Sequence, residues 1–204
     1  MQKTYDKFNK IRSTIENVRS ADSLNPSVVK RELTHLSPWA SVMARTLVLP
    51  GRTQPETYHS LQQADYVSVF AMDPDGRIPL VRQFRSALEK YTIELPGGLR
   101  DGDEQPIDCA MRELYEETGL KGSDAPIVLG CFAPDTGRLE NRLWGYAVHV
   151  PSVVASTWEP ELGVEPIWVS RKQLRQWLLS GEFDHALHIA LIGMALMHGF
   201  FEWN

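Results

Sequence analysis

The chain has 204 residues, of which 43% are hydrophobic and 23% charged, and its formal net charge is −5. This composition is typical of a globular protein and argues against disordered, collagen-like and coiled-coil classes. The acidic balance also argues against nucleic acid or an anionic membrane as the main partner, because both require a basic face.

The first 65 residues are predicted to form an extension with one helix and at least one strand. Apolar residues recur at three- and four-residue spacing within residues 5–19, which predicts an amphipathic helix. They are Phe8, Ile11, Ile15 and Val18. The run Ala40 to Leu49 predicts a strand between prolines. Both elements need a surface to bury, so we expect this extension to contribute to dimerisation.

The main domain is expected to span residues 66–204. The β-rich run 66–72, the turn signal Asp73-Pro74-Asp75-Gly76 and the run 78–84 predict a β-hairpin. Further strands are expected at 92–95, 127–132, 143–150 and 164–169. Helices are expected at 106–118, from Ser170 to about Leu179, and from Asp184 to about Met197.

The apolar stretch from 186 to 201 is shorter than the roughly 20 residues of a membrane span, so we interpret it as a buried helix. The beginning of the chain has no apolar signal segment, and two cysteines are too few for a disulfide scaffold. We therefore expect a cytoplasmic protein. Cys109, on the outer part of its helix, and Cys131 are interpreted as packing residues, and His185, His188 and His198 as residues of a helix surface.

Residues 101–117 carry seven acidic side chains and one basic side chain, a local balance of −6. Such a concentration is unfavourable unless solvent or cations screen it. Glu113 and Glu117 fall one helical turn apart beside the apolar face, and Glu116 points farther outward. Mg²⁺ or Mn²⁺ accepts such a rigid pair of oxygen ligands. From charge alone, a solvated acidic helix face remains an alternative.

The spacing of the fixed residues is more specific. Gly98, Glu104 and the run Arg112-Glu113-Leu114-Tyr115-Glu116-Glu117-Thr118-Gly119 match the complete Nudix box without gaps, so the chain resembles the Nudix hydrolases. A chance match has a probability on the order of 10⁻⁸ per starting point. The resemblance implies an α/β fold, the Nudix-type α/β/α sandwich with a mixed sheet, here joined to the N-terminal helix and β-rich extension. It also implies cleavage of a nucleoside diphosphate linked to another moiety.

The resemblance implies a role for each matching residue. Glu113, Glu116, Glu117 and the carbonyl of Gly97 would bind Mg²⁺, with Mn²⁺ as a second option. Glu104 and Arg112 would form a structural ion pair, in which a guanidinium offsets the acidic repulsion.

The resemblance further implies that a carboxylate removes a proton from the attacking water. Glu161, in the expected loop before residues 164–169, is the favoured base, with Glu116 and Glu117 assisting catalysis. Glu159 and Glu165 remain alternatives for the base, and a solvated acidic loop without a catalytic role remains a further interpretation.

Outside the box, the chain resembles the ADP-ribose and nucleotide-sugar pyrophosphatase branch. Arg85 would hold a phosphate, Glu94 would belong to a substrate-binding strand, and Pro134 follows Gly119 at the spacing of a marker of ADP-ribose-active members. Trp39 resembles aromatic residues that stack on adenine across a dimer interface, although a packing role is equally compatible.

The resemblance therefore implies a homodimer that hydrolyses ADP-ribose to AMP and ribose 5-phosphate. One alternative is a pyrophosphatase for a nucleotide sugar such as UDP-glucose or GDP-mannose. A second alternative is a non-catalytic Nudix-like ligand sensor.

Overall fold

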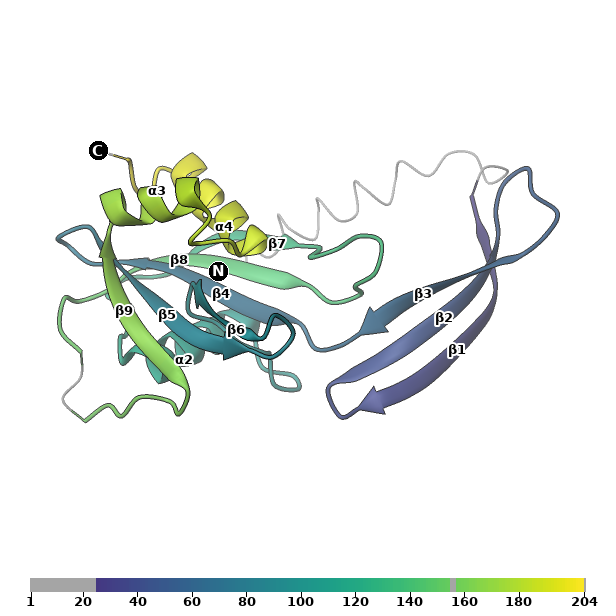
Figure 1. Ribbon diagram of the computed structural model, residues 1–204, viewed down its shortest axis with the longest axis horizontal. Helices are drawn as coiled ribbons and strands as arrows, with labels where there is room; N and C mark the ends of the chain where they lie inside the picture. Colours follow the sequence, from purple (N-terminus) through teal and green to yellow (C-terminus); the bar gives the residue numbers. More distant parts are fainter. Residues whose placement is uncertain (1–24, 155–156, 204) are drawn as a thin grey trace. The chain divides into compact units, whose positions relative to one another are not determined.

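The computed structural model describes residues 25–154 and 157–203, and its elements are labelled in Figure 1. The helix predicted over residues 5–19 lies outside the described residues. The chain divides after Leu61 into two compact units. None of the helices in the described ranges is long and apolar enough to cross a membrane.

The first unit contains a three-stranded sheet in the order β1-β2-β3. Its strands are β1 (Ser27–Ser37), β2 (Ala40–Val48) and β3 (Glu56–Gln62). The predicted strand at residues 40–49 is confirmed by β2, which pairs with β1 in antiparallel register. The sequence analysis did not identify β1 or β3. The apolar residues of β1 do not alternate along its sequence, and nearly all of its residues are exposed, so no period-two pattern reveals this strand.

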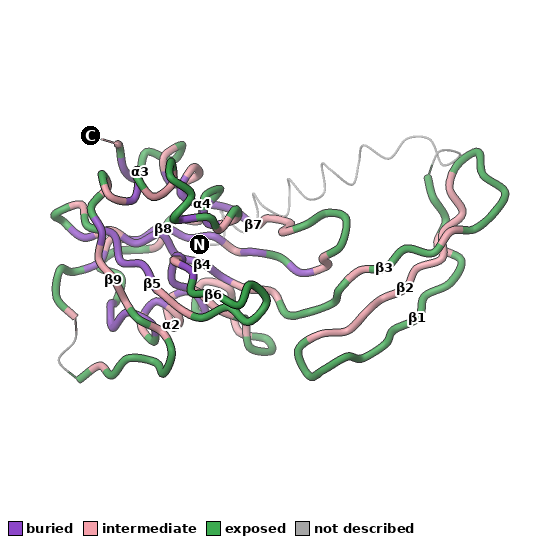
Figure 2. Tube along the Cα trace, in the orientation of Figure 1, coloured by how far each residue is buried: buried purple, intermediate pink, exposed green. Residues whose placement is uncertain are grey.

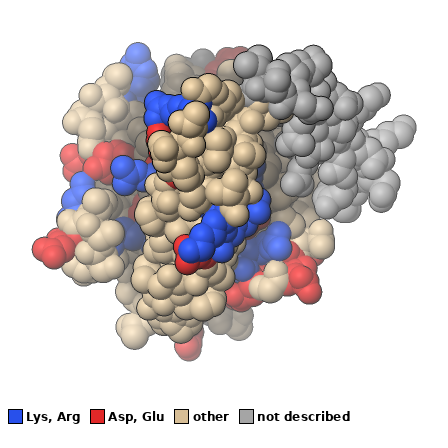
Figure 3. All heavy atoms as spheres, turned by 90° about the vertical axis from the view of Figure 1, so that its right-hand side faces the viewer, with Lys and Arg blue, Asp and Glu red and all other residues tan. Residues whose placement is uncertain are grey.

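Charged side chains of opposite sign lie side by side on the face shown in Figure 3. In the first unit, Lys30 pairs with Glu32 at 2.9 Å, and Arg52 pairs with Glu56. Exposed ion pairs of this kind contribute little to stability, typically about 0–1 kcal/mol.

The second unit contains two three-stranded sheets, in the orders β4-β8-β7 and β6-β5-β9. The first sheet comprises β4 (Tyr66–Met72), β8 (Leu143–His149) and β7 (Ile127–Phe132). The second sheet comprises β6 (Lys90–Glu94), β5 (Arg77–Arg85) and β9 (Val164–Ser170). In the first sheet β4 is parallel to β8 and β7 is antiparallel to it, whereas β5 is antiparallel to both of its neighbours.

The predicted hairpin of residues 66–72 and 78–84 is wrong. The turn is present, because the Asp73 N–H donates to the Arg77 carbonyl at 2.9 Å and the Asp73 carboxylate accepts from the Asp75 and Arg77 N–H groups. However, β4 and β5 belong to different sheets. A turn signal specifies a chain reversal, but long-range packing decides which strands pair.

The two sheets are joined through the segment that follows β6. The N–H groups of Val67 and Val69 on β4 donate to the carbonyls of Gly98 and Pro96, both at 2.9 Å. The opposite edge of β4 bonds to β8. The segment Pro96-Gly97-Gly98 therefore lies directly against a central strand.

Helices cover both sides of these sheets. The helix α2 (Pro106–Thr118) lies on one side, and α3 (Arg171–Ser180) and α4 (Ala186–Met197) lie on the other (Figure 1). The side chains of Val67, Val69 and Ala71 on β4 belong to the core cluster that includes α2, whereas Phe70 belongs to the cluster that includes α4. The most continuously buried segments in Figure 2 accordingly run through the strands. This arrangement confirms the predicted α/β/α sandwich with a mixed sheet.

Local signals account for the helix boundaries. Pro106 stands at the first turn of α2, and Gly119 ends it in the left-handed conformation with φ 70°, a geometry that favours glycine. Ser170 caps α3 by accepting from the Gln173 N–H at 3.1 Å, as the capping-box spacing predicts.

Candidate functional site

Glu117 occupies the last turn of α2, and its side chain is buried. The residue is 4% exposed, and its Oε2 accepts a hydrogen bond from the Gly97 N–H at 2.8 Å. Burial raises the pKa of Glu117 to about 8, and the negative charges of Glu113 and Glu161 add to this rise. A carboxylate with this pKa lies where a positive charge would stabilise its ionised form.

Glu113 lies one turn earlier and faces the same segment. A Cβ added to Gly98 would lie only 2.5 Å from the Glu113 Cδ, so the carboxylate lies against this glycine and would have to move if a side chain were present. The Glu113 side chain is 12% exposed and the Glu116 side chain 47% exposed. Burial raises the pKa of Glu113 as well. Glu113 and Glu117 thus share the inner flank of α2, as helical spacing predicts.

Arg112 connects the carboxylates of this region. Its Nε and Nη2 atoms donate to the two oxygens of Glu104 at 3.1 and 2.9 Å. Its Nη1 donates to Glu113 and to Glu116, both at 2.8 Å. The two parallel bonds to Glu104 lower the pKa of that carboxyl and fix the loop before α2 to the helix.

The donor set of this helix fits a hard divalent cation. Three carboxylates project from one and a half turns of α2, and the two inner ones are buried enough for their pKa values to rise. Mg²⁺ and Mn²⁺ prefer oxygen ligands. A bound cation would compensate the electrostatic cost of ionising Glu113 and Glu117 together.

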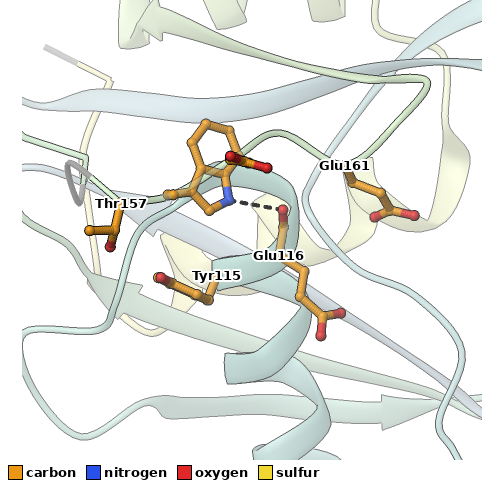
Figure 4. A pocket seen from close by; sticks show the side chains of 6 residues that line it. Tyr115, Glu116, Thr157 and Glu161 are labelled. Atoms are coloured by element: carbon orange, nitrogen blue, oxygen red, sulfur yellow. Dashed lines mark hydrogen bonds between the residues drawn. The ribbon is translucent and has the colours of Figure 1, made fainter.

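Glu161 lies in the loop between β8 and β9. Its negative charge is one of the smaller causes of the raised pKa values of Glu113 and Glu117, and its side chain lines the same cavity as Glu116. A cavity of about 360 Å³ lies beside it, lined by Tyr115, Glu116, Thr157, Trp158, Glu159 and Glu161. In Figure 4, Glu116 projects from the helix and Glu161 from the loop at this cavity.

The other two candidate bases differ in position. Glu159 lines the same cavity as Glu161. Glu165 stands on β9, where its Oε2 accepts from Arg82 Nη1 at 3.0 Å. This ion pair gives Glu165 a partner on β5.

Arg85 and Glu94 form a bidentate ion pair. Arg85 Nε and Nη2 donate to the two Glu94 oxygens at 2.8 and 2.6 Å, and Thr92 Oγ1 donates to Oε1 at 2.6 Å. Burial alone would raise the pKa of Glu94, but the bonds from Arg85 and Thr92 outweigh it and lower this pKa to about 2. The Arg85 side chain remains 44% exposed, so part of its guanidinium faces solvent.

The structure corrects the interpretation of His188. This residue is buried on α4 rather than exposed, and its Nδ1 accepts from the Leu95 N–H at 3.1 Å. The His185 ring stacks on it at 3.7 Å. Burial, followed by the neighbouring His185, lowers the pKa of His188 to about 3. Its spacing with Leu191, Ile192 and Ala195 is a core stripe, and this signal was present in the sequence.

Glu94, His185 and His188 place one ligand atom each within 4.8 Å of one another, but their bonding does not suit a metal ion. The Nδ1 of His188 is occupied by the Leu95 N–H, so the proton of the neutral ring is on Nε2. The Glu94 oxygens already accept from Arg85 and Thr92. This cluster therefore supports the segment that begins at Leu95.

Trp39 and Pro134 are the remaining residues predicted to bind substrate. Trp39 belongs to the first unit and is 71% exposed. Pro134 is half-buried in the loop between β7 and β8. The roles assigned to both residues remain predictions.

Cys109 does not lie on the outer part of α2, as the sequence analysis expected. It is fully buried, and its Sγ donates to the Leu99 carbonyl. Burial raises the pKa of its thiol to about 12, which agrees with an inert packing residue.

Comparisons with known proteins point to one family. The model of the NUDIX domain matches residues 62–190. The ADP-ribose pyrophosphatase of Bacillus subtilis (strain 168) is 45% identical over 53 residues, 26% of this chain and 29% of the relative. The ADP-ribose pyrophosphatase of Haemophilus influenzae is 29% identical over 140 residues, 62% of this chain and 63% of the relative.

A solved structure described as "Crystal structure of ADP compounds hydrolase" has a TM-score of 0.69 and 18% identity, covering 87% of this chain and 96% of that chain. This likeness concerns the fold. The chain spans about a third or less of the length of the first curated relatives it matches. The matches nevertheless confirm the resemblance that the box indicated. Because the domain model covers more than half of its residues, the chain belongs to the NUDIX domain family.

Proposed function

We propose that this chain hydrolyses the diphosphate linkage of a nucleoside diphosphate derivative in the presence of Mg²⁺. The observation that carries the proposal is the convergence of Glu113 and Glu117 on the segment Gly97-Gly98, with Glu161 close enough to raise the pKa values of both. A hydrolase that neutralises a diphosphate with a cation needs such a set of oxygen ligands beside a proton acceptor.

Glu113, Glu116, Glu117 and the carbonyl of Gly97 would hold Mg²⁺, with Mn²⁺ as the alternative. The cation would neutralise the diphosphate and lower the pKa of water. The Gly97 N–H orients the Glu117 carboxylate, and Arg112 orients Glu113 and Glu116. The chain thus holds its ligand carboxylates in place before any cation binds.

Glu161 would accept the proton of the attacking water. Its loop position leaves the carboxylate exposed beside the cavity, where water and a substrate phosphate can both reach it. Glu159 lines the same cavity and is the second candidate, whereas the ion pair with Arg82 makes Glu165 the weakest.

Arg85 would bind a substrate phosphate, and Glu94 would orient it. The bidentate pair leaves the guanidinium partly exposed, and planar donors of this kind suit phosphate oxygens. Trp39, supplied by a second copy in a homodimer, would stack on the base, and Pro134 would belong to the surrounding loop. A cytoplasmic location agrees with such a small-molecule substrate.

ADP-ribose is the substrate we favour, cleaved to AMP and ribose 5-phosphate. Support comes from the relatives named ADP-ribose pyrophosphatase. A nucleotide sugar such as UDP-glucose or GDP-mannose is the second candidate, since a mouse relative named ADP-sugar pyrophosphatase is 48% identical over 46 residues, 22% of this chain and 21% of the relative.

The test is a substrate panel of ADP-ribose, UDP-glucose, GDP-mannose and NADH with Mg²⁺, followed by product identification. ADP-ribose should give the highest kcat/KM, and Glu117→Gln purified in parallel should be inactive. A tenfold preference for a hexose nucleotide would overturn ADP-ribose as the substrate but would still support a diphosphate hydrolase. Binding of ADP-ribose without hydrolysis of any compound would favour a ligand sensor instead.

A further inference from the structure

In the described part of the loop between β8 and β9, the Trp158 side chain hydrogen-bonds to the end of α2. The Nε1–H of Trp158 donates to the Glu116 carbonyl at 3.1 Å, the bond drawn as a dashed line in Figure 4. An α-helix leaves its last four carbonyls without intrahelical partners. The Gly119 N–H satisfies the Tyr115 carbonyl at 2.8 Å, and the indole satisfies the next carbonyl in the chain.

Gly119 provides the surface on which this loop packs. A Cβ added there would lie 2.6 Å from Trp158 Cδ2 and 2.4 Å from Val154 Cγ1. The last glycine of the box therefore serves two purposes, because it adopts the left-handed cap of α2 and admits the indole. A side chain of any size would displace the loop from the helix.

Trp158 and Glu161 are separated by two residues, one of which is Pro160. Proline fixes its own φ near −65° and restricts the residue before it, so the connection between them has little freedom. On the other side, the Val164 N–H donates to the Glu161 carbonyl at 3.1 Å. Glu161 is thus held between the indole anchor and the start of β9.

We propose that Trp158 is a positioning residue that holds Glu161 beside the carboxylates of α2. This inference rests on the proposed function, in which Glu161 accepts a proton. Trp158 acts through Glu161. Its hydrogen bond and its packing on Gly119 tie the loop to the same helix that carries Glu113 and Glu117, so both halves of the site share one support.

The test uses Trp158→Phe, which keeps an aromatic ring and loses the donor, and Trp158→Ala, which loses both. We expect kcat to fall about threefold and about tenfold respectively, with KM within about twofold, because a misplaced proton acceptor affects the chemical step. Val153→Ala is the matched control, since Val153 is an exposed residue of the same loop, and it should leave kcat unchanged. Circular dichroism and thermal melting of each variant establish that it folds.

A double-mutant cycle with Glu161→Gln separates positioning from general loosening. If Trp158 acts through Glu161, adding Trp158→Phe or Trp158→Ala to Glu161→Gln should lower kcat by less than about twofold further. If the reductions in kcat of the two single variants multiply fully in the double variant, Trp158 does not act through Glu161 and the proposal is overturned. Unchanged kcat in folded Trp158→Ala would also overturn it.

A readout that does not depend on activity keeps this inference separate from the proposed function. A glutamate-specific protease should cleave after Glu161 several-fold faster in Trp158→Ala than in wild type, as mass spectrometry of the fragments would show. Equal rates would refute the anchor even in an inactive protein. Faster cleavage in a chain that hydrolyses nothing would retain the anchor and reject the proposed function.

Discussion

Glu117→Gln is expected to stabilise the metal-free protein while it removes activity. Burial raises the pKa of Glu117 from 4.5 to about 8, so the folded chain retains a proton that the unfolded chain releases. The wild type therefore loses stability as pH rises from 4.5 towards 8. At about 1.4 kcal/mol per pKa unit, this loss reaches about 4 kcal/mol at pH 8. Glutamine does not ionise, and its side-chain oxygen can still accept from the Gly97 N–H.

Urea denaturation of both proteins in EDTA at pH 4.5 and pH 8 measures this difference. The two free energies of unfolding should nearly coincide at pH 4.5, and the variant should be the more stable protein at pH 8. Excess Mg²⁺ should raise the stability of the wild type more than that of the variant. Glu116→Gln is the control, because its side chain is largely exposed. A variant no more stable than wild type at pH 8 would refute the electrostatic reasoning.

Three further outcomes follow from the geometry. Gly98→Ala should lower kcat/KM at least about tenfold with little change in melting temperature, because the new Cβ displaces the Glu113 carboxylate and such shifts strongly affect catalysis. Wild-type kinetics in this variant would contradict a functional role of the contact between Gly98 and Glu113. His188→Leu should lower the free energy of unfolding at pH 7, measured by urea denaturation, by about 1–3 kcal/mol because it leaves the Leu95 N–H unpaired, and His188→Asn should lower it less. Because the pKa of His188 is lowered to about 3, the stability of the wild type should also fall as pH drops from 6.5 towards 3. Light scattering at micromolar concentration should give about twice the chain mass of 23.1 kDa, and a monomer with full activity would contradict the predicted dimer.

The features that local chemistry determines could be predicted from the sequence. The helix α2 has the predicted bounds, because Pro106 and Gly119 act within one turn of its ends. The flank shared by Glu113 and Glu117 follows from helical spacing alone.

Features that depend on distant partners could not be predicted in the same way. The strand β4 pairs with β8, which lies more than 70 residues later, and no turn signal contains that information. Trp158 has an ordinary loop sequence around it, and its bond to Glu116 emerges only when the loop meets the helix. The helical spacing of apolar residues could have predicted that His188 is buried. Its role as a hydrogen-bond acceptor could not be predicted, because it depends on the position of Leu95 in the fold.

The bonds between β4 and the segment Pro96-Gly97-Gly98 have a consequence for how the second unit opens. Because Val67 and Val69 donate to this segment, their amide protons can exchange with solvent only when the segment that faces Glu113 and Glu117 leaves the sheet. Exchange at these two amides should therefore follow the opening of the carboxylate site. A ligand that binds the site should slow their exchange by the same factor by which it stabilises the closed state. Two backbone amides of a buried strand thus offer a spectroscopic measure of site occupancy that requires no substrate turnover.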